Sequence, residues 1–185
     1  RLPLQAPPGA GANIDIWLLG SSLFGAQLAA RLGLPYAFAA HFAPTQLDDA
    51  LRVYREFFQP SEQYEKPHVM VGTNAFAADT TEEAYLLASS GDQSIVALRT
   101  GTPGKLPPPV PGYRDSLPPQ AAAMLQSMRS VSAIGTREEV GEQLAALVRR
   151  TGADELILAG NCFDPAARER SLSLTMEAME AALPA

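Results

Sequence analysis

Residues 14–42 read IDIWLLGSSLFGAQLAARLGLPYAFAAHF, and this stretch indicates the fold class of the chain. Ile14–Leu19 is a nearly continuous apolar run, which predicts a parallel strand buried on both faces. Gly20, Ser21 and Ser22 interrupt the run, and a serine at this junction is suited to cap the start of a helix. The stretch therefore begins as a strand that passes through a tight polar turn into a helix.

A helix is predicted after the turn, because the apolar residues Phe24, Leu28 and Leu32 recur at four-residue spacing. These side chains are expected to face the core, and Gly33 is expected to end the helix. The next strand is predicted over Tyr36–Phe42. Strand, helix and strand in this order make one unit of a parallel α/β sheet.

The same alternation continues through the rest of the chain. Further strands are predicted over His68–Thr73 and Glu155–Ala159, which brings the expected total to four. Helices are predicted over Gln46–Phe58, from Thr80, through Met124–Met128, from Thr136 to Gly152 and from Asp164 onward. Such alternation indicates parallel strands joined by right-handed crossovers, so the fold class is α/β with parallel (β/α) units.

The predicted helices carry start signals and apolar stripes. The start signals are the capping-box pairs Thr80 with Glu83 and Thr136 with Glu139, a cap at Thr45, and Asp164 before Pro165. The residues expected to face the core are Leu47, Leu51, Tyr54 and Phe58; Ala84, Leu87 and Ala88; Val140, Leu144, Leu147 and Val148; and Leu172, Met176, Met179 and Leu183.

A proline-rich segment separates two of the predicted helices. Residues 101–119 hold seven prolines, including Pro107–Pro109, and this density excludes a regular helix or a central strand. We interpret the segment as an insertion within the fold, because strand and helix alternation resumes after it. Two roles stay open for it: shaping the mouth of a site, or wrapping the surface as a rigid strap.

Three segments carry a resemblance to a known family. They are WLLGSS (residues 17–22), AQLAARLGLPYAFAAHFAP (26–44) and IGTREEVGEQLAALVRRTGADELIL (134–158). In this order they resemble the carboxyl-terminal half of the bacterial-luciferase-like family of flavin-dependent monooxygenases, from about Ile14 to Leu183. The resemblance implies an eight-stranded TIM-type (β/α) barrel that binds reduced FMN, or the deazaflavin F420 in one branch, and acts on a small organic substrate.

The chain departs from the family in size. It offers four predicted strands and 185 residues, whereas a complete barrel has eight strands and typically takes roughly 250 residues. Residues 14–185 are therefore expected to form strands 5 to 8 of the barrel, with the insertion at 101–119 and a linker at 1–13. The chain begins at Arg1, and nothing in it corresponds to the histidine-bearing loop and cis peptide that the family keeps under the flavin ring. The principal catalytic groups are expected outside this sequence, so no catalytic residue is assigned.

The turn Gly20–Ser22 is the candidate cofactor site. A helix amino terminus that follows a parallel strand offers unpaired N–H groups and a partial positive charge to an anion. The resemblance implies that backbone amides and hydroxyls after the fifth barrel strand hold the flavin 5′-phosphate. It assigns Ser21 and Ser22 as phosphate contacts and Gly20 as the position that lets the backbone approach closely. Plain helix capping is the structural alternative for the same residues.

Other polar residues are given structural interpretations. His41, near the end of the second strand, can meet flavin or substrate or move a proton, but a hydrogen-bonded structural role is preferred. His68 opens the third strand, on the barrel face associated with stability, and is assigned no chemistry. Cys162 is expected to be a packed residue and Asp164 a helix cap. No spacing of ligand residues predicts a metal site.

The composition limits the classes of partner. The chain has 20 Asp+Glu against 14 Lys+Arg, for a formal net charge of −6, and no basic run, so a nucleic-acid surface is not expected. No stretch is apolar enough for a membrane span, and no secretory signal opens the chain. Because Cys162 is the one cysteine, no internal disulfide can form, and a reducing, cytoplasmic setting is expected.

The leading hypothesis is a fragment, expected to be inactive alone, of an oxidoreductase that uses reduced FMN and O₂ on a small organic substrate. A flavin reductase would supply the reduced FMN, and a homo-oligomer is expected. The first alternative is an F420-dependent relative that transfers hydride. The second is a non-catalytic half-barrel that acts in assembly, because open sheet edges invite pairing with another chain. The third is another phosphate-binding barrel enzyme, such as an isomerase or aldolase, which explains the alternation but not the resemblance.

Overall fold

The computed structural model describes residues 14–182, so the predicted linker at 1–13 and the predicted stripe residue Leu183 lie outside the described residues. The strands are β1 (Leu18–Gly20), β2 (Tyr36–Ala39), β3 (Val69–Ala77), β4 (Ala133–Gly135) and β5 (Glu155–Ala159). The α-helices are α1 (Leu23–Leu32), α2 (Leu47–Glu56), α3 (Thr81–Arg99), α4 (Pro119–Met128), α5 (Arg137–Thr151) and α6 (Pro165–Ala182). The short 3₁₀ helices are η1 (Pro44–Gln46) and η2 (Tyr113–Ser116).

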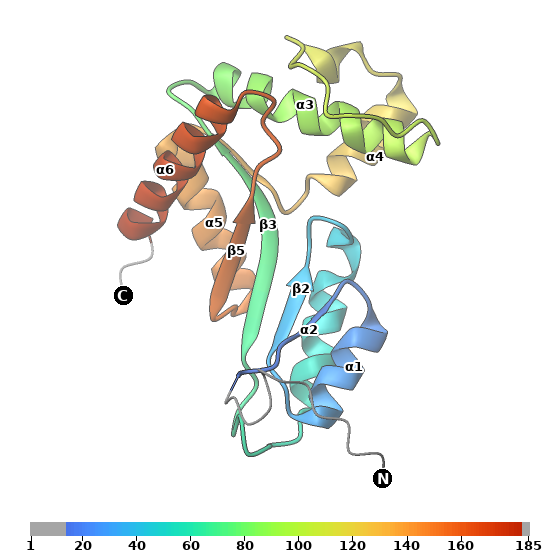
Figure 1. The fold of residues 1–185 in the computed structure, drawn as a ribbon, viewed down its shortest axis with the longest axis vertical. Coiled ribbons are helices and arrows are strands. Elements are labelled where there is room, and N and C mark those ends of the chain that lie inside the picture. Colours follow the sequence, from blue (N-terminus) through green and yellow to red (C-terminus); the bar gives the residue numbers. More distant parts are fainter. Residues whose placement is uncertain (1–13, 183–185) are drawn as a thin grey trace, which may run out of the picture.

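The strands pair in parallel throughout the described sheet (Figure 1). β1 lies beside β2, with Gly20 opposite Phe38, and β2 lies beside β3. The long strand β3 also pairs with β5 along Met70–Asn74 and with β4 along Ala75–Ala77. Within residues 14–182, β1 pairs only with β2 and β5 only with β3, so this sheet is open. The parallel α/β class and the partial TIM-type barrel are therefore confirmed.

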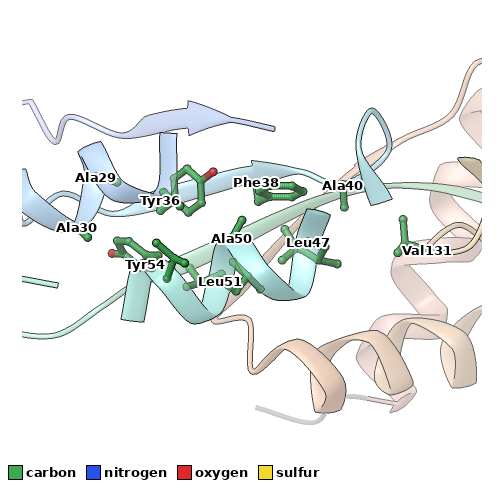
Figure 2. Close-up of a cluster of buried hydrophobic side chains, with 14 of the residues drawn as sticks. Ala29, Ala30, Tyr36, Phe38, Ala40, Leu47, Ala50, Leu51, Tyr54 and Val131 are labelled. Atoms are coloured by element: carbon green, nitrogen blue, oxygen red, sulfur yellow. The ribbon is translucent and has the colours of Figure 1, made fainter. Parts of the chain in front are cut away.

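The largest core cluster lies between α1, α2 and the first three strands (Figure 2). Tyr36 and Phe38 of β2 pack against α2, which contributes Leu47, Leu51 and Tyr54, and all five side chains are buried. The last three residues occupy one face of α2 at helical spacing. The predicted stripe of α2 is thus confirmed for these residues.

Two further clusters cover the rest of the sheet. Val140 and Leu144 of α5 pack with α6 against β3 and β4, as the stripe of α5 predicted. Ala84 and Ala88 of α3 pack on Phe76, in the carboxyl-terminal half of β3. The two halves of β3 therefore belong to different packing environments.

Most helix boundaries follow the predicted signals. The hydroxyl oxygens of Ser22, Thr80 and Thr136 each accept a hydrogen bond from the backbone N–H three residues later. Thr136 also takes part in the complete capping box that the sequence predicted. Gly33 and Gly152 end α1 and α5 with φ of 62° and 58°, in the left-handed region that favours glycine.

The first strand is shorter and less buried than predicted. It covers Leu18–Gly20 instead of Ile14–Leu19, and the side chains of Ile14 and Ile16 are 72% and 62% exposed. Within β1, Leu18 is half-buried and Leu19 is 70% exposed, and because successive side chains point to opposite faces, the described residues cover only one face of this strand. The prediction of burial on both faces is wrong for this part of the chain.

Helix α1 packs through small residues instead of its predicted stripe. Phe24 is 73% exposed, and Leu28 and Leu32 are exposed as well. The residues of α1 that face the core are Gly25, Ala26, Ala29 and Ala30. Small residues let α1 lie close to β2 and α2. The spacing of these small residues also fits one face of a helix. Periodicity alone did not distinguish the two faces.

Smaller differences concern element ends. β2 ends at Ala39 rather than Phe42, β3 continues to Ala77 rather than Thr73, and Gln46 precedes α2 without a side-chain cap from Thr45. β4 is an additional strand of three residues, too short for alternation to reveal.

Helix α6 buries polar and small residues where large ones were predicted. Its buried residues are Ser171, Thr175 and Ala178, whereas Met176 is 52% exposed. The Ser171 hydroxyl accepts a hydrogen bond from the Ala77 N–H at 2.9 Å, which compensates the burial of this polar group. No helix of the described chain is both long and apolar enough to cross a membrane.

Candidate functional site

The carboxyl-terminal ends of the strands lie along one rim of the sheet, because the strands are parallel (Figure 1). Gly20 ends β1 at this rim, directly before Ser21 and Ser22. His41 follows β2 and Asn161 follows β5 on the same side. Binding sites of (β/α) barrels lie on this face. The structure therefore places the predicted cofactor turn where a barrel site is expected.

The turn is built around the start of α1. Ser22 has extended backbone angles, and its hydroxyl accepts a long hydrogen bond of 3.5 Å from the Gly25 N–H. Ser21 is half-buried and Ser22 is exposed. The first turn of α1 carries no acidic residue, so no carboxylate of that turn offsets the partial positive charge of the helix amino terminus. The turn is thus able to attract an anion.

A hydrogen bond from Tyr36 of β2 holds the turn in place. Its side chain is fully buried, and its hydroxyl donates a hydrogen bond of 3.1 Å to the carbonyl oxygen of Ser22. Burial raises the pKa of Tyr36 to about 12, so the hydroxyl keeps its proton at neutral pH and remains a donor. The turn is therefore attached to β2 as well as to its own helix.

Gly20 is not required by its neighbours among residues 14–182. A methyl group at Gly20 would lie 3.4 Å from the Tyr36 hydroxyl oxygen and 3.5 Å from Gly25 Cα, which are ordinary contact distances. Its φ is not positive either. Neither packing nor backbone conformation therefore accounts for glycine here. Close approach of a ligand to the backbone stays as the interpretation of Gly20.

His41 has the hydrogen-bonded role that was preferred for it. Its Nδ1 lies 3.1 Å from the Gly72 carbonyl oxygen. Because a carbonyl oxygen only accepts, Nδ1 donates its N–H to this oxygen. The ring packs on Phe42, with ring centroids 4.2 Å apart. His41 is thus held in place by β3 next to the rim.

The other predicted structural residues also agree with the structure. His68 precedes β3 at the opposite rim, and its Nε2 lies 2.7 Å from a Glu155 carboxylate oxygen. Cys162 is 3% exposed and belongs to the core cluster under α3. Burial raises the pKa of the Cys162 thiol, which disfavours the nucleophilic thiolate. Asp164 caps α6 through a 2.7 Å hydrogen bond from the Ala167 N–H.

No group of three or more His, Cys, Asp and Glu side chains within residues 14–182 is arranged to hold a metal ion.

The structure does contain a charged cluster that the sequence analysis missed. Asp92, in the middle of α3, is fully buried and lies 2.7 Å from the Nε atoms of both Arg114 and Arg129. The signal in the sequence was an aspartate inside the otherwise small and apolar run of α3, but its partners are 22 and 37 residues away.

The proline-rich segment lies along α3, beyond the carboxyl-terminal ends of the strands (Figure 1). The Val110 N–H donates to the Ser89 hydroxyl at 2.8 Å, and the Gln93 amide donates to the Pro108 carbonyl oxygen at 2.9 Å. The segment is therefore tied to α3 as a strap. A cavity of about 530 Å³ also lies between the strap and α3.

Comparison with known proteins identifies related sequences over most of the chain. The family model described as Luciferase-like monooxygenase matches residues 1–155. A luciferase-like monooxygenase of Escherichia coli (strain K12) is 45% identical over 173 residues, which are 94% of this chain and 52% of the relative. The protein YvbT of Bacillus subtilis (strain 168) is 43% identical over 174 residues, with the same coverage. The chain thus spans about half the length of the curated relatives it matches.

Solved structures share the fold. The apo-MsnO8 crystal structure matches with a TM-score of 0.79 and 28% identity. The match covers 97% of this chain and 55% of the MsnO8 chain. The oxygenating constituent of 3,6-diketocamphane monooxygenase from Pseudomonas putida, in complex with FMN, has a TM-score of 0.56 and 22% identity. It covers 86% of this chain and 46% of its own, and at this identity it supports the fold alone.

Proposed function

This chain belongs to the luciferase-like monooxygenase family, and on this basis we propose that it forms the phosphate-binding half of a flavin-dependent monooxygenase. The observation that carries the proposal is the position of the Gly20–Ser22 turn, at the carboxyl-terminal rim of a parallel sheet and at the start of α1. We propose FMN as the flavin because it is the cofactor that the resemblance to the luciferase-like family implies first.

In this proposal the turn holds the 5′-phosphate of the flavin. The hydroxyls of Ser21 and Ser22 and the free N–H groups at the start of α1 donate hydrogen bonds to the phosphate oxygens. Gly20 lets the phosphate approach the backbone, and the buried hydroxyl of Tyr36 keeps the turn in place. The amino-terminal charge of α1 contributes about 0.3–2 kcal/mol, so the turn orients the cofactor without retaining it alone.

Reduced flavin supplies the chemistry with O₂ when it is bound, and this chain supplies orientation. His41 is held through Nδ1 at the carboxyl-terminal rim, the face on which we place the flavin and the substrate. The catalytic groups are contributed by residues outside this sequence. A small organic compound is the substrate class, and an F420-dependent hydride transferase is the alternative within the same fold.

The edges of the described sheet carry exposed apolar residues, and a second half-barrel is suited to cover them. Leu19 and Phe24 at the β1 edge and Ile157 on β5 are more than half exposed. Apolar residues exposed at two edges of one sheet are typical of surfaces that meet another layer of protein. We propose that four further (β/α) units cover them, supplied by the remainder of a longer protein. A second copy of this chain is the rival, and it would make the chain an assembly module.

The test compares FMN with riboflavin, which lacks the phosphate. Flavin fluorescence is titrated with the complete gene product and with its Ser21→Ala/Ser22→Gly double variant, in which Gly keeps most of the capping at position 22. We expect FMN to bind about tenfold or more tightly than riboflavin, and the double variant to lose this preference. Ser173→Ala, on the exposed side of α6, is the matched control.

An undiminished FMN preference in the double variant would reject the assigned turn. Failure of the complete gene product to bind either FMN or F420 would reject the flavin function. Tighter binding of F420 than of FMN would select the deazaflavin alternative.

A further inference from the structure

The middle of α3 is buried but polar. The buried residues in this part of the helix are Ser89, Ser90, Gly91 and Asp92. Burial of an aspartate without compensation costs several kcal/mol, so such a residue is kept only where partners neutralise it. The structure supplies two partners for this one carboxylate.

Both partners use only one nitrogen for Asp92. Arg129 Nε lies 2.7 Å from Asp92 Oδ1, and Arg114 Nε lies 2.7 Å from Asp92 Oδ2. An arginine that closes an ion pair by itself commonly donates from two nitrogens to both carboxylate oxygens. Here the carboxylate is divided between two guanidinium groups. Two positive charges and one negative charge leave a net charge of +1 in the cluster.

Donors are left over on both arginines. Arg114 Nη2 is buried and has no hydrogen-bond partner among the described residues. The Arg129 side chain is only 5% exposed, and its guanidinium lies 5.2 Å from the ring centre of Phe76. Gly91 gives it room, because a methyl group there would lie 2.9 Å from Arg129 Nη2. A buried donor without a partner calls for an explanation, and a bound anion is one.

The two arginines line the same cavity. It has a volume of about 410 Å³ and lies between α3, the strap and α4. Leu117 and Leu125 give it apolar walls, and Tyr85 also lines it, with the Arg114 guanidinium 4.7 Å from the Tyr85 ring centre. Tyr85 and Arg114 also line the cavity of about 530 Å³ under the strap, so the two cavities share these two lining residues.

We propose that this cavity binds the carboxylate of a small organic acid, with the acid's apolar body against Leu117 and Leu125. A single negative charge matches the net charge of the cluster, and the unused guanidinium nitrogens are suited to the two oxygens of a carboxylate. The residues involved are distinct from the Gly20–Ser22 turn, so the proposal does not depend on flavin binding.

The experiment uses isothermal titration calorimetry of the purified chain with hexanoate as the probe. Hexan-1-ol has the same apolar body without charge and serves as the control ligand. We expect hexanoate to bind and hexanol to bind about tenfold or more weakly. We expect Arg114→Gln to lose the difference between the two ligands, because Arg114 provides the buried free donor.

Arg52→Gln is the matched control variant, because Arg52 lies on the exposed surface of α2 and its ion-pair partners among the described residues are Asp49 and Glu56. It should bind hexanoate like the unmodified chain. Circular dichroism establishes that each variant is folded before titration. Equal binding of hexanoate and hexanol, absence of hexanoate binding, or unchanged hexanoate binding by folded Arg114→Gln would each overturn the proposal. Should Arg114→Gln not fold, Gln126→Glu is the second variant, because it adds a negative charge to the lining of the cavity at an exposed position, and unchanged hexanoate binding by folded Gln126→Glu would overturn the proposal as well.

Discussion

The buried hydroxyl of Tyr36 donates a hydrogen bond to the carbonyl oxygen of Ser22, so the second strand supports the turn that ends the first. The two residues are 14 positions apart in sequence and belong to neighbouring parallel strands and their connection. This bond explains how a short turn at a sheet edge keeps a defined shape. A substitution at Tyr36 can therefore perturb the turn while its own residues, Gly20–Ser22, stay unchanged.

Tyr36→Phe should lower the free energy of unfolding by about 1 kcal/mol, because it removes one hydrogen bond and keeps the ring in the core. The same change should weaken the preference for FMN over riboflavin, since the turn loses its support. Urea unfolding followed by circular dichroism measures the first effect. Tyr64→Phe makes the same chemical change away from the turn, and it should leave the flavin preference unchanged. A Tyr36→Phe variant with full FMN preference would show that the bond does not position the turn.

The stability of the chain should fall at high pH through Tyr36. Its folded pKa is raised from 10.0 to about 12, so the unfolded chain loses this proton first. The contribution is fully present below pH 10 and is lost between pH 10 and 12, with a slope of up to about 1.4 kcal/mol per pH unit for this residue. Unfolding free energies measured across this range for the unmodified chain and for Tyr36→Phe isolate the contribution. Parallel pH profiles would contradict the prediction.

Gly72→Ala should destabilise the fold by about 1–3 kcal/mol, because the added methyl group overpacks the site. It would lie 3.2 Å from Ile157 Cγ2 and 3.3 Å from His41 Cε1. The histidine would have to move, and its hydrogen bond to the Gly72 carbonyl oxygen would weaken. Gly104→Ala is the control, because no atom of residues 14–182 lies within 4 Å of a methyl group there. Urea denaturation should separate the two variants, and equal midpoints would refute the expected crowding.

Cys162 should react slowly with thiol reagents in the folded chain. The side chain is 3% exposed, and burial raises the pKa of its thiol, so little thiolate is available. Labelling with an aromatic disulfide reagent should be accelerated by denaturing concentrations of urea, by about 100-fold or more on the basis of burial. Fast labelling under native conditions would mean that the carboxyl-terminal part of the sheet opens readily.

Phe24→Ser should leave the stability nearly unchanged and should reduce self-association of the isolated chain. Phe24 is exposed at the β1 edge and gives the helix no core contact, so its removal costs little free energy. Phe38→Ser, at a fully buried position of β2, is the contrasting variant and should lose about 3–5 kcal/mol. Analytical ultracentrifugation measures the association state. If Phe24→Ser instead associates as strongly as the unmodified chain, the β1 edge is not the surface of contact.

The local pattern of the sequence was sufficient for the order of the main elements and for most of their boundaries. Thr136 with Glu139, Gly33 and Asp164 act within one turn of helix, so neighbouring residues contain all the information that their roles require. The strand at Glu155–Ala159 was predicted with its observed limits. The position of Ser21 and Ser22 at the rim could also be predicted from neighbouring residues, because they follow a parallel strand and the carboxyl-terminal ends of parallel strands lie at one rim of the sheet.

Contacts between distant segments could not be read from the sequence. Phe24 belongs to a set of large residues at helical spacing, and Ala26 belongs to a set of small ones. Periodicity fits either set, and only packing against β2 and α2 places the small residues inside. Asp92 meets Arg114 and Arg129 through the path of the strap, and Tyr36 meets Ser22 through the pairing of β1 with β2. Short-range patterns fix backbone conformation, because that depends on adjacent residues. Facing surfaces, buried charges and cavities depend on which segments the folded chain brings together.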